Sequence, residues 1–266
     1  SSLRYSKNTV DVLYEDLLEC SLNDSIDQIL GSFDFISLET ANLSFHYGSE
    51  NEKILNGVNL IINKSDRVGI LGPSGSGKTT LIDTLLGLLE PCGGDLIING
   101  KPVNDIPTNF LSKVAYLPQE SFIVDGDIRS NVAFGLTQSA IDENLVIDSL
   151  KKAKLYEDIS KLKDGIFTNL GERGIRLSGG QKQRISLARA FYHKREIFVM
   201  DESTSSLDTK TETAIVDSMQ QIGGEITMVI IAHRIETLKY CNKLFKLDNG
   251  ALSFLGSYND FISKNE

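Results

Sequence analysis

The apolar positions of the chain fall into two recurrent patterns. Short, fully apolar runs such as Ile197–Met200 and Met228–Ala232 are typical of strands buried in a parallel sheet. Segments with apolar residues three and four positions apart, such as Val10–Leu18, indicate amphipathic helices. Because strands and helical segments alternate along much of the chain, we predict an α/β fold with right-handed crossovers.

The pattern also gives the approximate extent of each element. Helical segments are expected at 10–18, 24–30, 81–86, 178–190, about 209–221 and the C-terminus, and the stretch from about 124 to 190 is predicted to form a small helical subdomain. Strands are expected at 36–38, 43–45, 54–62, 67–71, 96–98, 114–117, 197–200, 228–232, 244–247 and 251–255.

One glycine-rich stretch lies between the strand at 67–71 and the helix at 81–86. It reads Gly72-Pro73-Ser74-Gly75-Ser76-Gly77-Lys78-Thr79-Thr80. Glycines in this context let successive N–H groups point into one concavity, and the helix start adds its positive dipole end. Lys78 can then reach the β- and γ-phosphates of a nucleotide, while the Thr79 hydroxyl can bind Mg²⁺. The alternative, a glycine-rich turn with a solvated lysine, is disfavoured by the strand before and the helix after, so we predict binding of a nucleoside triphosphate.

The amino-acid composition restricts the kinds of binding partner and the cellular compartment that we expect. The 266 residues carry a net charge of 27 − 36 = −9 with a pI near 5.0, which argues against nucleic acid as the main partner. Cys20, Cys92 and Cys241 are odd in number and far apart, so they indicate neither a disulfide framework nor a zinc site. A reducing cytosol is the natural compartment. The sequence contains no apolar run of ~20 residues and no signal-peptide pattern.

Two acids follow the apolar strand at 197–200. Phosphoryl transfer needs a carboxylate to hold Mg²⁺ and a group to orient water, and the end of a strand near the phosphate loop is where such groups lie. We therefore assign Asp201 to the metal, directly or through water, and Glu202 to the general base that polarises the attacking water. From the residues alone, Glu202 as a solvated loop acid remains an alternative.

A second anion-binding helix start is predicted at residues 177–181. These residues are Leu177-Ser178-Gly179-Gly180-Gln181. Ser178 is a suitable N-cap, and the two glycines leave the backbone N–H groups accessible. Since the stretch has no lysine and no metal-binding hydroxyl pair, it resembles half of a nucleotide site.

The order of these motifs resembles the ATP-binding cassette (ABC) family of transporter ATPases, from about residue 35 to 262. The resemblance implies a P-loop core with a mixed, mainly parallel sheet, an antiparallel β-subdomain and a small helical subdomain. It also implies that Tyr47 stacks on adenine, that Gln119 senses the γ-phosphate and contacts the metal, and that His233 contacts the γ-phosphate. Asp208, in Ser206-Leu207-Asp208, would belong to the loop that links two sites. Without the other motifs, a tyrosine such as Tyr47 is more often a packing or turn residue than a contact to a base. A histidine such as His233 is likewise more often structural than a phosphate contact.

In this family two chains pair head-to-tail. The resemblance implies that the phosphate loop of one copy faces Ser178, Gly179, Gly180 and Gln181 of the other, with each ATP shared. Ser65-Asp66, Thr79-Thr80 and Ser206 depart from the commonest family residues but remove no phosphate, metal or water ligand. We therefore expect a homodimer with two competent sites.

Two further stretches resemble the exporter branch of the family. They are residues 121–132 and 171–174, which in exporters meet the intracellular loops of the membrane domain. Residues 1–33, which start without Met, are expected to be linker helices from an upstream transmembrane domain of the same polypeptide, and residues 34–266 the ATPase domain. This predicts a place on the cytoplasmic face of the inner membrane. A weak similarity to flippases for lipid-linked saccharides leaves peptide and drug exporters as close alternatives.

The sequence disagrees with the features that three alternative functions predict. A soluble ATPase of the same superfamily that acts on DNA or ribosomes would show basic patches, long coiled-coil inserts or tandem cassettes. A non-hydrolysing ATP switch would lack Glu202 or His233, and both are present. Small-molecule kinases share the phosphate loop but have no reason to carry the stretch at 177–181.

Overall fold

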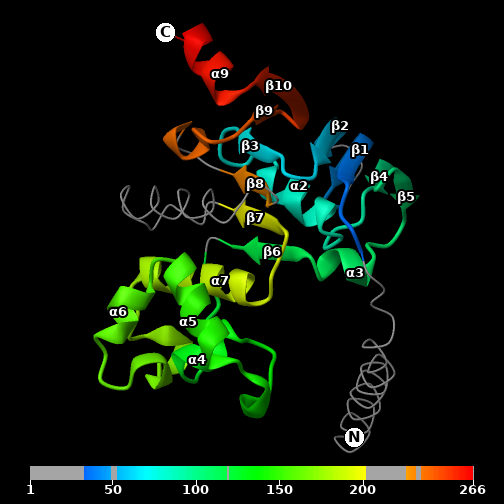
Figure 1. The fold of residues 1–266 in the computed structure, drawn as a ribbon. Coiled ribbons are helices and arrows are strands. Elements are labelled where there is room, and N and C mark those ends of the chain that lie inside the picture. Colours follow the sequence, from blue (N-terminus) through cyan, green and yellow to red (C-terminus); the bar gives the residue numbers. More distant parts are fainter. Residues whose placement is uncertain (1–32, 49–52, 119, 202–225, 232–234, 266) are drawn as a thin grey trace, which may run out of the picture.

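The computed structural model describes residues 33–48, 53–118, 120–201, 226–231 and 235–265. A six-stranded sheet in the order β10-β9-β3-β8-β7-β6 forms its centre (Figure 1). Strands β9, β3, β8, β7 and β6 are parallel, and β10 pairs with β9 in an antiparallel hairpin at one edge. The strands are β3 (Arg67–Leu71), β6 (Val114–Leu117), β7 (Ile197–Asp201), β8 (Thr227–Ile231), β9 (Lys243–Asp248) and β10 (Ala251–Gly256).

A second sheet is antiparallel and has the order β2-β1-β4-β5. Its strands are β1 (Ser37–His46), β2 (Lys53–Asn63), β4 (Gly93–Ile98) and β5 (Lys101–Val103). The expected combination of a mainly parallel mixed sheet with an antiparallel sheet in an α/β fold is confirmed.

Two details of the antiparallel sheet differ from the sequence-based expectation. The strands expected at 36–38 and 43–45 are one strand, β1, whose register shifts between Thr40 and Leu43. Asn42 has a left-handed backbone there (φ +52°), so the polar break in the pattern marks a β-bulge and not a loop. Strand β5 was not expected, because it has only three residues and contains Pro102, which an edge strand tolerates.

The helices lie around these sheets and at one end of the larger one (Figure 1). They are α2 (Lys78–Leu85), α3 (Thr108–Leu111), α4 (Ile128–Val132), α5 (Glu143–Lys152), α6 (Tyr156–Ser160), α7 (Gly179–Tyr192) and α9 (Tyr258–Asn265). Short 3₁₀ turns occur at Gln138–Ala140, Gly165–Phe167, Glu172–Gly174 and Ile235–Leu238. Helices α4 to α7 belong to one long insertion between the neighbouring strands β6 and β7.

The expected helices at 10–18, 24–30 and about 209–221 lie outside the described residues. Within the part of the chain that the structure describes, no helix combines the length and the apolar composition that crossing a membrane requires.

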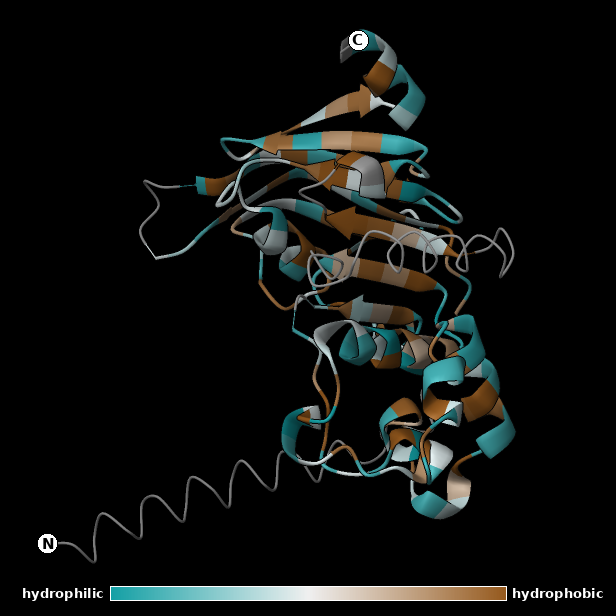
Figure 2. Cartoon of the chain, turned by 90° about the vertical axis from the view of Figure 1, so that its left-hand side faces the viewer, coloured by the Kyte–Doolittle hydropathy of each residue, from teal (hydrophilic) through white to brown (hydrophobic). Residues whose placement is uncertain are grey.

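Strands β7 and β8 bury side chains on both faces, as their continuous apolar runs predict. Figure 2 shows the hydrophobic colour of the strands in the sheet. Val199 and Val229 belong to a core that includes Ile82 and Leu85 of α2 and the inner face of the antiparallel sheet. Their sequence neighbours Phe198 and Met228 belong to the opposite core, which includes α7 and the other helices of the insertion. The period of two along each strand thus separates an α2 face from an α7 face.

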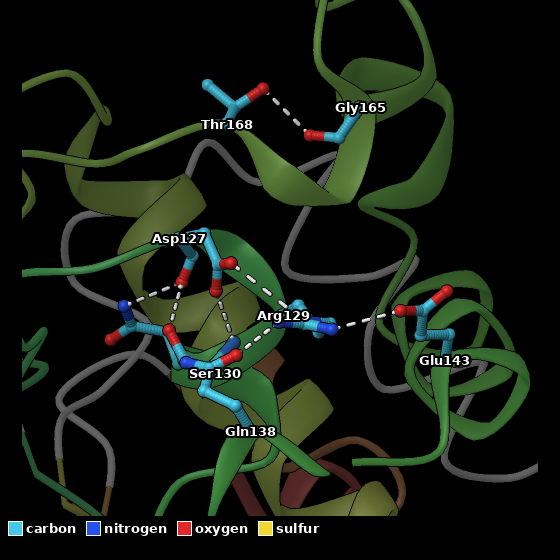
Figure 3. Close-up of polar contacts among 8 residues, drawn as sticks. Asp127, Arg129, Ser130, Gln138, Glu143, Gly165 and Thr168 are labelled. Carbon is cyan, nitrogen blue, oxygen red and sulfur yellow. Dashed lines mark hydrogen bonds and ion pairs between the residues drawn. The ribbon is translucent and has the colours of Figure 1, made fainter.

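A polar network fixes the first helix of the insertion (Figure 3). Asp127 caps α4 by accepting a 2.7 Å hydrogen bond from the Ser130 backbone N–H. Arg129 donates to Gln138 and forms a 3.0 Å ion pair with Glu143, at the start of α5. These contacts tie α4, the 3₁₀ turn at Gln138–Ala140 and α5 into one unit.

Candidate functional site

The loop between β3 and α2 curls where two glycines adopt left-handed backbone angles. Gly75 has φ +78° and Gly77, the N-cap of α2, has φ +94°. A Cβ atom on Gly77 would also lie 2.9 Å from the Ile54 side chain and 3.1 Å from its carbonyl oxygen. Glycine is required at Gly77 both by the backbone angle and by the close approach of β2.

Gly72 requires glycine for a different reason. A Cβ atom there would lie 2.3 Å from the Leu247 carbonyl oxygen of β9 and 2.7 Å from the Ser76 hydroxyl. The start of the loop is therefore packed directly against the backbone of a neighbouring strand.

The Gly72→Ala variant is expected to be destabilised by about 1–3 kcal/mol, because the new methyl group displaces backbone that cannot move aside cheaply. Urea denaturation measures this change. Gly93→Ala is the matched control, since a Cβ atom there meets only ordinary contact with Ser44 at 4.0 Å. Equal stability of Gly72→Ala and the parent chain would mean that the loop does not approach β9 as described.

Lys78, the first residue of α2, is buried with 5% of its surface exposed. Its ammonium group donates hydrogen bonds to the carbonyl oxygens of Gly72, at 3.0 Å, and Pro73, at 2.9 Å. The positive charge is thereby held over the loop whose N–H groups form the anion-binding concavity.

A hydroxyl and a carboxylate meet next to the loop. The Thr79 hydroxyl donates a 3.0 Å hydrogen bond to Oδ2 of Asp201, although the two residues are 122 positions apart. Asp201 ends β7 and is 7% exposed, and Thr79 is the second residue of α2, the helix that follows β3. Strand β8 lies between β3 and β7, so the two residues meet across the carboxyl edge of the sheet.

Two residues near Asp201 were not predicted from the sequence. Tyr116 of β6 has a hydroxyl 3.5 Å from Asp201 Oδ2, and burial, followed by the charges of Asp201 and Asp83, raises its pKa to about 12. Burial and then the charge of Asp201 also raise the pKa of Asp83, in α2. Only the pairing of strands identifies Tyr116: β6 and β7 are parallel neighbours, so the end of β6 lies beside the end of β7.

Tyr47 lies at the outer side of the loop. It is 57% exposed, its ring packs edge-on against Phe45 at 4.8 Å, and its hydroxyl is 3.5 Å from the Thr80 hydroxyl. A cavity of about 370 Å³ joins this ring to the loop and the carboxylate. Its lining residues are Tyr47, Ile54, Ser74, Gly75, Gly77, Lys78, Thr79, Thr80 and Asp201.

Ser178 begins α7 and lies outside that cavity. Its hydroxyl accepts from the Gln181 N–H at 3.3 Å, and the Gln181 side chain accepts from the Ser178 N–H at 3.0 Å, which together form a capping box. Ser178 and Gly179 are exposed. Gly179 lines a different cavity of about 640 Å³. The structure therefore separates this helix start from the phosphate loop of the same chain.

Four predicted site residues lie outside the described residues: Gln119, Glu202, Asp208 and His233. Three of the strands that precede them, β6, β7 and β8, are parallel to β3 and end at the edge where the phosphate loop begins. Their roles stay predictions.

A glycine-shaped loop at a helix start, a buried lysine and a hydroxyl–carboxylate pair at one sheet edge define a P-loop nucleoside triphosphate-binding protein. Comparison with known proteins identifies the family within this class. Residues 55–205 match the family described as ABC transporter, so the chain belongs to this family. ATP-binding domains of this family are ATPases.

Several similar proteins have names that refer to export or translocation. An export ATP-binding/permease protein of Rickettsia felis is 40% identical over 238 residues, which are 89% of this chain and 41% of that protein. The alpha-hemolysin translocation ATP-binding protein HlyB of Escherichia coli O157:H7 is 35% identical over 96% of this chain and 35% of its own length. A bacterial Atm1-family ABC exporter solved with ATP bound superposes with a TM-score of 0.81 and 31% identity, over 89% of this chain and 41% of that chain.

The chain thus spans about 41% or less of the length of these relatives. None of their names supports the alternative of a soluble ATPase that acts on nucleic acid or ribosomes.

Proposed function

We propose that this chain is the ATP-hydrolysing part of a membrane exporter and that it works as a head-to-tail pair of identical chains. The observation that carries the proposal is the exposed, capped start of α7. Ser178 and Gly179 form an anion-binding helix start that the phosphate loop of the same chain does not use. A second copy can present its bound triphosphate to this helix start, which would complete two shared sites.

The residues next to the phosphate loop fit Mg²⁺. Thr79 and Asp201 offer a hydroxyl and a carboxylate 3.0 Å apart, which are the hard oxygen ligands that Mg²⁺ prefers. The described residues hold no group of three or more His, Cys, Asp or Glu that could cage an ion. That matches Mg²⁺, which takes one or two protein ligands and completes its shell with phosphate and water. When bound, the ion would neutralise phosphate charge.

In this proposal each residue of the chain has a defined task. Lys78 leaves its carbonyl partners and binds the β- and γ-phosphates, and the backbone N–H groups of residues 74–80 surround them. Glu202 takes the proton of the attacking water. Gln119 and His233 contact the γ-phosphate, Tyr47 stacks on adenine, and Asp208 belongs to the loop between the two sites. Ser178–Gln181 contact the triphosphate of the partner but not the diphosphate that hydrolysis leaves. These contacts therefore favour the closed pair of chains until ATP is hydrolysed.

The export role rests on the relatives, which are named as export and translocation ATP-binding proteins. We place residues 1–33 as the linker from an upstream transmembrane domain and the ATPase on the cytoplasmic face of the membrane. Residues 121–132 and 171–174 would then face that domain. Lipid-linked saccharides, peptides and drugs are the candidate cargoes.

The Ser178→Arg variant is expected to lose about 100-fold in ATP hydrolysis while monomeric ATP affinity is unchanged, because the helix start touches only the partner's nucleotide. Ser178→Asp keeps a capping side chain but sets negative charge against the phosphate, so it should show the same split. ATP turnover and binding to the isolated monomer measure the two quantities.

Ser139→Arg is the matched control, because Ser139 is exposed on the insertion and gains the same charge. A parallel loss of hydrolysis and monomer affinity in both Ser178 variants would contradict the shared site.

A further inference from the structure

Tyr116 and Asp201 lie on the same face of the six-stranded sheet. Tyr116 is paired with Val199 across the parallel strands β6 and β7, so the two side chains share a face. Asp201 is two residues beyond Val199 and therefore shares that face as well. This is the α2 face, since Val199 packs in the core that includes Ile82 and Leu85 of α2.

Two hydroxyl groups from different elements converge on one oxygen of Asp201. Thr79, in α2, donates to Oδ2 at 3.0 Å, and Tyr116, in β6, approaches the same oxygen at 3.5 Å. The second distance is at the long end for a hydrogen bond, and such bonds often tighten when the ligand is in place. Oδ2 is thus approached by hydroxyl groups of two elements, α2 and β6.

We propose that Tyr116 is a positioning residue for the metal-binding carboxylate, an inference that rests on the proposed role of Asp201. A donor that contacts a ligating carboxylate fixes its orientation and supports metal affinity. The phenol is a neutral donor near pH 7, so it does not compete with Asp201 for the ion as another carboxylate would. Tyr116 therefore holds Asp201 in the orientation that presents it to the ion, while Thr79 both donates to Asp201 and faces the nucleotide.

The simpler alternative is that Tyr116 only packs. Tyr116 is on the edge strand β6 and is one of the residues that line a cavity of about 370 Å³, together with Phe122, Phe134 and Arg189. Packing requires the ring, whereas positioning requires the hydroxyl. Tyr116→Phe removes the hydroxyl alone and so separates the two roles. Tyr192→Phe is the matched control, because the Tyr192 hydroxyl accepts a 3.1 Å hydrogen bond from the Asp142 N–H in the insertion, away from the nucleotide cavity.

The test measures the affinity of Mn²⁺ for the complex of the chain with ADP, by electron paramagnetic resonance of the free ion. Tyr116→Phe is expected to weaken Mn²⁺ binding about 3- to 10-fold and to leave ADP affinity in EDTA unchanged, because outer contacts to a metal ligand act on the metal. Tyr192→Phe should change neither quantity.

Two outcomes would overturn the inference. Parental Mn²⁺ affinity in Tyr116→Phe would show that the hydroxyl does not act on the carboxylate. An equal loss of metal-free ADP affinity would make Tyr116 structural. If the parent chain with ADP bound no Mn²⁺, the proposed metal role of Asp201 would fail first. That result is distinct from a failure of Tyr116 alone.

Discussion

The Lys78→Ala variant is expected to hydrolyse ATP at least about 100-fold more slowly and to bind it roughly 10- to 150-fold more weakly. The ammonium group is buried and fixed over the phosphate loop by two backbone carbonyl oxygens, so no other side chain can take its place there. A hydrogen bond from a charged donor is worth about 1.5–3 kcal/mol, which corresponds to that loss of affinity. Hydrolysis is expected to slow because Lys78 would no longer donate a hydrogen bond to the phosphate oxygens, whose negative charge changes in the transition state.

Binding is measured by titration calorimetry and hydrolysis by phosphate release. Lys101→Ala removes an exposed lysine from β5 and is expected to change neither. The melting temperature of each variant should stay close to that of the parent, which separates a local effect from unfolding. Unchanged turnover in Lys78→Ala would refute the assignment of the phosphate loop.

The Glu202→Gln variant is expected to slow hydrolysis by about 10²–10⁴-fold, the range for removal of a general base. Glutamine keeps the size of the side chain but cannot accept the proton of water. Because ATP would persist, the proposed pair of chains should persist as well. Gel filtration in saturating Mg²⁺ and ATP should then show a dimer that the parent chain does not accumulate.

Glu157→Gln makes the same chemical change at an exposed position of α6 and should leave turnover and elution volume unchanged. A monomeric Glu202→Gln variant in saturating Mg²⁺ and ATP would count against the shared site. Normal turnover in that variant would instead make Glu202 a solvated acid, the alternative that the sequence leaves open.

Local patterns predicted much of the fold and the phosphate loop. The loop is recognisable because glycine spacing, a preceding strand and a following helix act within a few residues of one another. The buried parallel strands are recognisable because both of their faces are apolar. These features depend on residues that are close together in the sequence, so the local sequence pattern is enough to predict them.

The features that were missed depend on contacts between distant segments. Tyr116 reaches Asp201 only because β6 pairs with β7 in one particular register, and an isolated tyrosine carries no sign of that pairing. Asp83 differs from an ordinary helix-surface acid only through its burial and the charge of Asp201 nearby. The bulge at Asn42 similarly involves a distant segment, since a Cβ atom on Gly94 would lie 2.4 Å from the Asn42 carbonyl oxygen.

The hydrogen bond between Thr79 and Asp201 spans 122 positions of sequence, and this has a consequence for biosynthesis. At about 5–20 residues per second, a ribosome that has just made the lysine-bearing loop needs roughly 6–24 seconds more to add the carboxylate. The nascent chain therefore holds a cationic loop without its acidic counterpart for that interval. Only a polypeptide elongated past β7 can form this hydrogen bond, so the proposed metal-dependent binding of nucleotide would be a late property of the growing chain.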